Sequence, residues 1–310
     1  MKQVAVLVAA SPTPGFYSQI SALSIALQCL AWADWTFTLH VYFAGDFDSA
    51  LHQRWLPHLR ADISWSSGRR FAAAGDWAQS DDVFRCGPRD ADVILTLDAD
   101  TFPVASLSTA LDRVLEEDMV AGVIAHYPFP RVPDCSVREG WARVTQGIID
   151  VPLEFSFSHT LMPPEAPAEL RLTPFYVNGG VVFFSRKAFA GVAAEYLPIR
   201  PRLMSRMADG DFAGQAAVTL AIAASGARTA PLPMRYNFPN DPIAEQLYPD
   251  ELASAMIFHY LRTDAFDRQQ IFASPEGYAK FLSLPLSGSN RVFQQHVRRV
   301  IGAAYPFPRA

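Results

Sequence analysis

The feature that most constrains the fold is the alternation of strand and helix signals over the first 125 residues. Apolar strands are predicted at Val4–Val8, Thr36–Phe43, Asp92–Leu97 and Met119–Ala125, and helices at Ser18–Ala31, Ser49–Leu59 and Ser106–Glu117. Strands this apolar are buried on both faces of a sheet. Their alternation with helices predicts the α/β class, with a mostly parallel central sheet covered by helices on both sides.

The rest of the chain does not show this regular alternation of strands and helices. Residues 126–173 are rich in proline and carry one helical patch, near Val137–Ile149. A strand follows in "PFYVNGGVVFFSR", where Asn178, Gly179 and Gly180 interrupt the apolar run. Glycines inside a strand mark a bulge or a close backbone approach. Further on we predict helices from Lys187 and from Phe212 to Ala224, a last strand in "AMIFHYLR" and a C-terminal helix in "SNRVFQQHVRRVIG". No clean linker divides the sequence, so we expect one domain over residues 1–310.

Composition excludes several classes of protein. The net charge of −5 argues against a general nucleic-acid binder, which needs a basic surface. The three cysteines are widely separated, so neither a disulfide framework nor a zinc site is expected. No apolar run approaches the roughly 18 residues of a membrane span, and a cytoplasmic location fits best. The sequence also lacks the glycine-rich P-loop, the dinucleotide-binding fingerprint and the nucleophile-elbow motif of hydrolases.

Two carboxylates end the third predicted strand. In "VILTLDADTFPV", Asp98 and Asp100 lie two residues apart, on the same side of an extended backbone. Ligands of parallel sheets bind beyond the carboxyl ends of the strands, and paired carboxylates suit Mg²⁺ or Mn²⁺. Such a metal can hold a diphosphate and neutralise its charge as it leaves. The alternative is a turn or a helix cap, since Asp is common in both and Pro103 follows.

An ordered set of motifs resembles a known family. The segments "VILTLDADTFPV", "YVNGGVVFFSR", "FAGQAAVTLAI", "LPMRYNF" and "IFHYLR" occur in the order seen in GT-A fold nucleotide-sugar glycosyltransferases, most like glycosyltransferase family 8. The resemblance runs from about residue 3 to residue 262, without residues 126–173. It implies a GT-A fold with one Rossmann-like sheet and a DxD motif. It also implies Mn²⁺ (or Mg²⁺) as cofactor, and transfer of a sugar from a nucleoside diphosphate, UDP being favoured, to an acceptor hydroxyl with retention.

The resemblance also assigns metal and diphosphate ligands. Asp98 and Asp100 resemble the DxD motif, and His259 in "FHY" resembles the third protein ligand of the metal. The alternative for His259 is a core histidine with satisfied hydrogen bonds. The family's diphosphate-binding Lys is absent, and Arg262 is the closest substitute.

Residues around the sugar follow from the same comparison. Asn178, Gly179 and Gly180 resemble the segment that lines donor sugar and acceptor, and Gln215 resembles a glutamine that touches the sugar. The family has an Asp before this glutamine, whereas this sequence has Gly214. Asp211, or Asp209 close to it, is a candidate for the missing carboxylate, the alternative for both being a helix cap.

The nucleotide is expected near the first strand. The turn from Ala9 to Tyr17 resembles the uridine-binding segment, and Tyr17 either stacks on the base or packs against the following helix. An arginine that reaches the nucleotide is expected before the DxD strand. Arg69, Arg70 and Arg85 are the candidates, of which Arg85 is preferred.

Acceptor and mechanism are less constrained. The acceptor, a glycan, a lipid-linked molecule or a small molecule, is expected to meet residues 126–173 and the C-terminal extension 263–310. The C-terminal arginines Arg291, Arg298 and Arg299 either contact an anionic membrane or lie on a surface helix packed on the domain. A same-face mechanism with retention is favoured; inversion would need a general base, for which Asp209 or Asp211 would serve. The alternatives to an active transferase are a non-catalytic nucleotide-sugar-binding relative and a DxD-dependent phosphohydrolase. The phosphohydrolase motif Asp-x-Asp-x-Thr/Val requires Thr or Val where this sequence has Phe102.

Overall fold

A seven-stranded sheet forms the centre of the protein. The computed structural model describes residues 1–66, 78–129, 135–207 and 212–308. Across the sheet, the strands are β10 (Arg228–Pro231), β6 (Met119–Ile124), β9 (Val177–Ser185), β4 (Val93–Leu97), β1 (Lys2–Ala10), β2 (Trp35–Phe43) and β3 (Asp62–Trp65). Only β9 runs antiparallel to its neighbours. The predicted α/β class with a mostly parallel central sheet is therefore confirmed.

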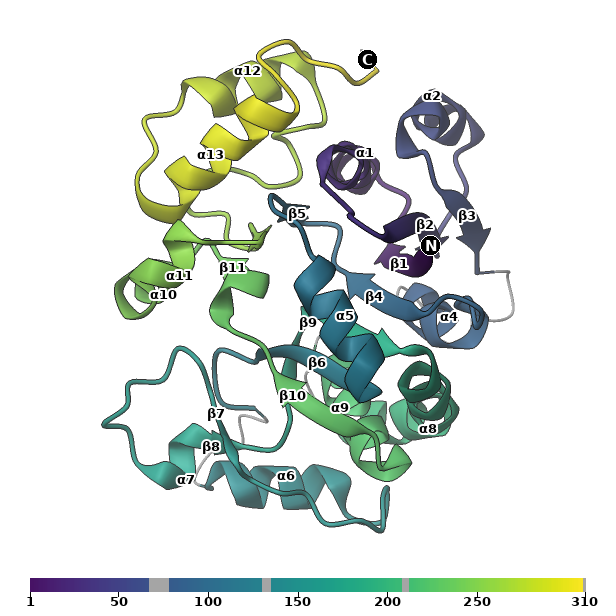
Figure 1. The fold of residues 1–310 in the computed structure, drawn as a ribbon, viewed down its shortest axis with the longest axis vertical. Helices are drawn as coiled ribbons and strands as arrows, with labels where there is room; N and C mark the ends of the chain where they lie inside the picture. Colours follow the sequence, from purple (N-terminus) through teal and green to yellow (C-terminus); the bar gives the residue numbers. More distant parts are fainter. Residues whose placement is uncertain (67–77, 130–134, 208–211, 309–310) are drawn as a thin grey trace.

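Helices cover both faces of this sheet (Figure 1). In β1, Val4, Val6 and Val8 point to one core and Ala5 and Leu7 to the other, as the twofold period of a strand requires. The first core receives side chains from α1 (Pro14–Cys29), α2 (Ser49–Leu59), α5 (Ser108–Glu117), α12 (Pro275–Ser283) and α13 (Gly288–Val300). The second receives them from α4 (Ala78–Cys86), α6 (Val137–Thr145), α8 (Arg186–Met204) and α9 (Ala213–Ser225).

A small three-stranded sheet stands beyond the end of β4. It joins β11 (Phe238–Pro239), β12 (Ile257–His259) and β5 (Thr101–Pro103) in that order. The strand predicted in "AMIFHYLR" is thus confirmed but short, and it lies outside the central sheet. The remaining elements are β7 (Phe157–Ser158), α7 (Ala168–Arg171), β8 (Leu172–Thr173), a 3₁₀ turn (Met234–Tyr236), α10 (Pro242–Leu247) and α11 (Pro249–Ala253).

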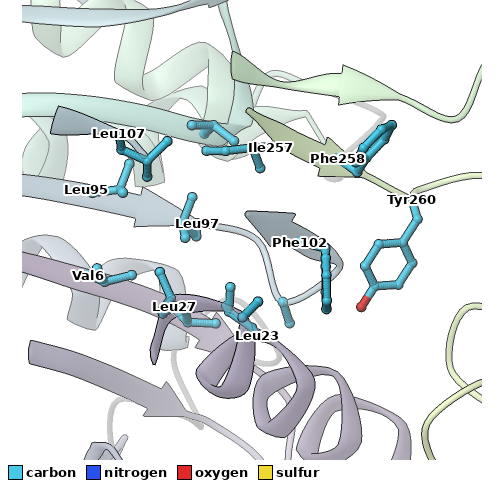
Figure 2. Packing of buried hydrophobic residues seen from close by; sticks show 14 of the residues in the cluster. Val6, Leu23, Leu27, Leu95, Leu97, Phe102, Leu107, Ile257, Phe258 and Tyr260 are labelled. Carbon is cyan, nitrogen blue, oxygen red and sulfur yellow. The ribbon is translucent and has the colours of Figure 1, made fainter. Parts of the chain in front are cut away.

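The C-terminal helices pack onto the small sheet rather than standing apart from it. The ring of Phe293 in α13 is fully buried and stacks on Tyr260, with ring centroids 4.6 Å apart. It also meets Phe102 of β5 edge-on at 5.7 Å. Figure 2 shows Phe102 facing Tyr260, next to the cluster of Leu23, Leu27 and Leu97. The C-terminal extension is therefore part of the core that supports the end of the DxD strand.

Local signals explain where the sequence predictions were wrong. Helix α1 begins at Pro14, four residues before the predicted start, because Thr13 caps it by accepting a hydrogen bond from the backbone N–H of Phe16. Strand β3 and helix α4 were not predicted, since their short polar sequences lack a clear apolar period. No helix in the described ranges is both long and apolar enough to cross a membrane.

Candidate functional site

Two short strands bring the predicted metal ligands together. Strand β5 follows the DxD turn directly and pairs antiparallel with β12, which places His259 opposite Thr101. The turn is held by the backbone N–H and the hydroxyl of Thr101, which both donate to the carbonyl of Asp98 at 3.1 and 2.7 Å. On the far side, the backbone N–H of Asp98 donates to the carbonyl of Gly180 at 3.0 Å. The site therefore lies where β4, β9 and the small sheet meet.

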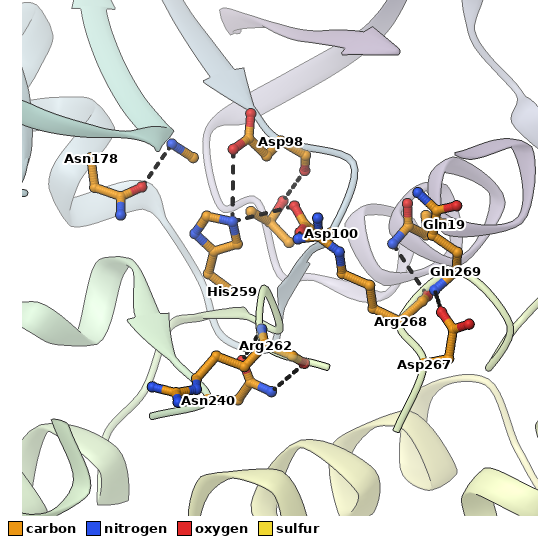
Figure 3. A network of polar contacts seen from close by, with 12 residues as sticks. Gln19, Asp98, Asp100, Asn178, Asn240, His259, Arg262, Asp267, Arg268 and Gln269 are labelled. Atoms are coloured by element: carbon orange, nitrogen blue, oxygen red, sulfur yellow. Dashed lines mark hydrogen bonds and ion pairs between the residues drawn. The ribbon is translucent and has the colours of Figure 1, made fainter. Parts of the chain in front are cut away.

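The side chains of Asp98, Asp100 and His259 converge there. Each offers one ligand atom, and these atoms all lie within 4.8 Å of one another. The Nε2 atom of His259 is 3.3 Å from Oδ1 of Asp100 and 3.7 Å from Oδ2 of Asp98. Figure 3 shows all three side chains pointing toward one another. The two carboxylates suit Mn²⁺ or Mg²⁺, and an imidazole nitrogen is a common metal ligand, so the residues present can hold the implied divalent metal.

Buried Asn237 orients the histidine. Its Oδ1 atom lies 3.0 Å from Nδ1 of His259 and can only accept a hydrogen bond. With Oδ1 as the acceptor, the imidazole donates from Nδ1, and Nε2 faces the two carboxylates. Amide and carboxylate partners hold metal-binding histidines in this way in many proteins. His259 is thus held with Nε2 toward the two carboxylates, where it could act as the predicted third ligand.

Asp100 lies beside two groups that can carry positive charge, His259 and Arg268. Burial alone would raise the pKa of this carboxyl, but the charges of His259 and Arg268 outweigh it and hold the pKa below the ordinary value. Burial alone would lower the pKa of His259, yet neighbouring Asp100 raises it. The two aspartates form an anionic site beside His259 and Arg268, and a divalent cation would take over the balancing of their charge.

Gly180 makes room for the histidine. A Cβ atom at this position would lie 2.5 Å from Nδ1 of His259 and closer still to Cε1. Real Cβ contacts are never this short, so only glycine lets the ring reach the carboxylates. The glycine interruption of β9 therefore serves a close approach to a protein side chain, and the pairing of β9 with β6 also shifts register here.

The structure places Arg268, and not Arg262, beside the predicted metal ligand Asp100. The guanidinium of Arg268 forms an ion pair with Oδ2 of Asp100, as Figure 3 shows. The Arg268 carbonyl accepts a hydrogen bond at 3.2 Å from Nε2 of Gln19 in α1. In contrast, Arg262 is paired with both Asp241 and Asp264. The cation next to the DxD motif thus comes from a segment that lies beyond the family resemblance.

Asn178 and Gln215 hold the two glycines of β9. The side-chain oxygen of Gln215 accepts from the N–H of Gly179, and that of Asn178 accepts from the N–H of Gly180, both at 3.0 Å. Because their oxygens are engaged with the backbone, their amide NH₂ groups remain as hydrogen-bond donors. Two donors are therefore presented beside the carboxylates.

A cavity of about 230 Å³ opens beside Asp98. It lies between the sheet and helices α4, α8 and α9, and Ala9, Gly179 and Gln215 are among the residues that line it. Its size is far above that of a packing void. The predicted donor residues Asp98, Gly179, Gln215 and Ala9 therefore line one open cavity.

Three predictions for the nucleotide and the base fare differently. The ring of Tyr17 is 1% exposed, packs on Phe43 at 4.9 Å and bonds His52 through its hydroxyl at 3.0 Å. No face of Tyr17 is open to a base, so it has the packing role and the predicted stacking role is wrong.

Arg85 is half exposed on α4, 3.8 Å from Asp82, and does not line the cavity. Asp211, like Asp209, Arg69 and Arg70, lies outside the described residues.

Solved structures of two glycosyltransferases are similar to this chain. The galactosyltransferase LgtC, solved in complex with donor and acceptor sugar analogs, matches with a TM-score of 0.52 and 15% identity, covering 96% of each chain. Mouse xyloside xylosyltransferase 1 matches with a TM-score of 0.49 and 13% identity over 84% of this chain and 98% of its own. No protein family and no curated protein sequence matches this chain.

The likeness to LgtC establishes the fold. It extends over nearly the whole of both chains, so it covers the central sheet and also the C-terminal segment that carries Arg268. The chain therefore has the GT-A fold of glycosyltransferases that its ordered motifs predicted. At 15% identity, substrate and chemistry have to be argued from the site itself.

Proposed function

We propose that this protein is a metal-dependent glycosyltransferase that moves a sugar from a nucleoside diphosphate, UDP being favoured, to the hydroxyl of a glycan, lipid-linked or small-molecule acceptor. The observation that carries the proposal is the convergence of Asp98, Asp100 and His259 within 4.8 Å beside an open cavity. This arrangement stands at the carboxyl end of β4, where ligands of such sheets bind. Asp98, Asp100 and His259 would hold Mn²⁺ or Mg²⁺.

Charge neutralisation at the leaving group is the main contribution we assign to the site. A divalent cation held there offsets the negative charge that the diphosphate gains as its bond to the sugar breaks. Arg268 reaches the same place from the other side, and its planar guanidinium can donate two parallel hydrogen bonds to phosphate oxygens. Arg262 remains the second candidate for this role, but its two carboxylate partners would have to release it.

We further propose that the anomeric configuration is retained. The bond between the anomeric carbon and the diphosphate oxygen breaks, the acceptor oxygen attacks from the same face, and its proton passes to the departing phosphate. Gln215 and Asn178 would orient the sugar and the acceptor through their free amide groups. Gln215 is an amide and not a carboxylate, so it supplies no anionic nucleophile, in accord with a same-face reaction.

The test begins with calorimetric binding of UDP, GDP and CDP, each with and without Mn²⁺. We expect one of them to bind tightly only when the metal is present. Sugars carried on that nucleotide are then screened for release of the nucleoside diphosphate. Metal-dependent binding without any turnover would instead identify a non-catalytic relative, and release of phosphate from simple phosphomonoesters would identify a phosphohydrolase.

Replacing Arg268 with Gln should separate its two effects. Without nucleotide, the variant is expected to bind Mn²⁺ more tightly, because Asp100 no longer has a competing cationic partner. With Mn²⁺ present, it should bind the nucleoside diphosphate about tenfold more weakly, since a charge-assisted contact is lost. Calorimetry of both steps measures this, with Arg262→Gln as the matched control. An Arg262→Gln variant with the larger loss of nucleotide affinity would return the diphosphate role to Arg262.

A further inference from the structure

The apolar wall of the cavity limits which substituents a bound donor sugar can carry. The cavity runs from Asp98, whose side chain is 56% exposed, to the buried rings of Phe84 and Phe184. Its other walls include Leu7, Val83 and Val218. An unsubstituted hexose presents hydroxyls all around its ring, and each one needs a hydrogen-bond partner when it leaves water. Much of the cavity wall is apolar and offers no hydrogen-bond partner to such hydroxyls.

Several polar groups that line the cavity already have hydrogen-bond partners, while Ser80 contributes a further hydroxyl to its wall. Thr96 donates its hydroxyl proton to the carbonyl of Val182 at 3.3 Å. The Gln215 oxygen accepts from Gly179 at 3.0 Å, which leaves the Gln215 NH₂ group as a donor. The hydroxyl of Tyr196 is hydrogen-bonded to Arg200. A ligand in this cavity therefore meets hydrogen-bonding groups at Gln215, Ser80 and Asp98, and apolar surface over the rest of the wall.

Gly214 keeps this space open. It stands in the first turn of α9 and lines the cavity, and a Cβ atom there would meet only the Tyr196 hydroxyl, at 3.8 Å. Its backbone is not in the left-handed region, so neither the conformation nor the packing requires glycine. Glycine is also a poorer helix former than alanine. The fold therefore does not require the absence of a side chain at 214, and glycine there leaves space in the cavity for a ligand group.

From these observations we propose that the donor sugar carries a methyl-terminated substituent, an acetamido group or a C6 methyl in place of hydroxymethyl, which is seated in the apolar cavity beside Gly214. The methyl would contact Val83, Phe84 and Val218. In the acetamido case, the carbonyl would accept from the NH₂ group of Gln215. This inference rests on the proposed function and narrows the class of its donor.

The experiment compares sugars on one nucleotide. With Mn²⁺ present, calorimetry measures the nucleoside diphosphate that binds tightest, alone and carrying glucose, galactose, N-acetylglucosamine, N-acetylgalactosamine, 6-deoxyglucose or 6-deoxygalactose. We expect one methyl-bearing class to bind at least about tenfold tighter than glucose and galactose, the ratio that one unpaired buried hydroxyl produces. The acetamido and 6-deoxy arms show which of the two it is. Equal or tighter binding of the glucosyl or galactosyl donor overturns the inference.

Two variants of similar size test the cavity itself. Gly214→Leu fills the space with an apolar group, so it should weaken binding of the preferred donor about tenfold and leave the nucleoside diphosphate alone unaffected. Gly214→Asp fills the same space but adds hydrogen-bond acceptors, so it should shift the preference toward glucose or galactose. If neither variant changes the ratio of donor affinities, the cavity does not hold the sugar and the inference falls.

Failure of the inference and failure of the proposed function give different results. If a nucleoside diphosphate binds with Mn²⁺ but the sugars are not discriminated, only the assignment of the donor class is lost. If no nucleoside diphosphate binds with or without Mn²⁺, the glycosyltransferase proposal is lost and the donor class with it.

Discussion

Replacing Asp100 with Asn is expected to weaken Mn²⁺ binding by on the order of a hundredfold or more and to remove metal-dependent nucleotide binding. The substitution keeps the shape of the side chain and removes its charge. Loss of groups that merely orient a metal ligand already costs about 10- to 100-fold in affinity, so loss of an anionic ligand should cost at least as much. Calorimetric titration with Mn²⁺, and with UDP, GDP and CDP in its presence, measures both effects.

The matched control is Asp92→Asn, at the other end of the same strand. Asp92 accepts from the backbone of Gln3 and pairs with Arg186, each at 2.9 Å, so it also has defined partners. This variant should retain full affinity for Mn²⁺ and nucleotide, and circular dichroism melting curves will show whether both proteins are folded. Unchanged nucleotide binding by folded Asp100→Asn would mean that the DxD aspartates are turn residues, and the proposed function would have to be abandoned.

Much of the central architecture could be predicted because its signals are local. The strand predicted at Asp92–Leu97 is a nearly continuous apolar run and is observed at Val93–Leu97, one residue shorter. The helix predicted at Ser49–Leu59 is observed at those bounds. The position of Asp98 and Asp100 follows from the same pattern, because residues that follow a buried strand lie at the carboxyl ends of the strands, where ligands bind. Where periodicity was weak, as in Asp62–Trp65, the prediction missed the element.

The contacts that complete the site depend on distant parts of the chain. Arg268 meets Asp100 across 168 residues of sequence, and no spacing rule relates the two. A basic residue a few positions after His259 was a fair prediction, but the loop turns so that Arg262 meets Asp241 and Asp264 instead. Likewise, an aromatic residue after the first strand resembled a base-stacking group, whereas helix α1 starts early enough to bury Tyr17. Tertiary packing decided each of these cases.

The two glycines of β9 offer the sharpest test of how the metal site is built. Gly180→Ala is expected to weaken Mn²⁺ binding at least about tenfold, because its Cβ would lie 2.5 Å from Nδ1 of His259 and must push the ring away from the carboxylates. The ring has no free space to retreat into, since Asn237 holds it and only 5% of the residue is exposed. Titration with Mn²⁺ measures the loss.

Gly179→Ala is the natural control, one residue away on the same strand. Its Cβ would approach only the Gln215 side chain, at 3.5 Å, an ordinary contact distance. Both variants add one methyl group to one strand, so a general effect on β9 would lower Mn²⁺ affinity in both alike. Loss confined to Gly180→Ala means that His259 binds the metal and that the bare backbone of Gly180 is what lets it do so. Equal affinities in the two variants would place His259 outside the coordination sphere and leave the aspartates as the protein ligands.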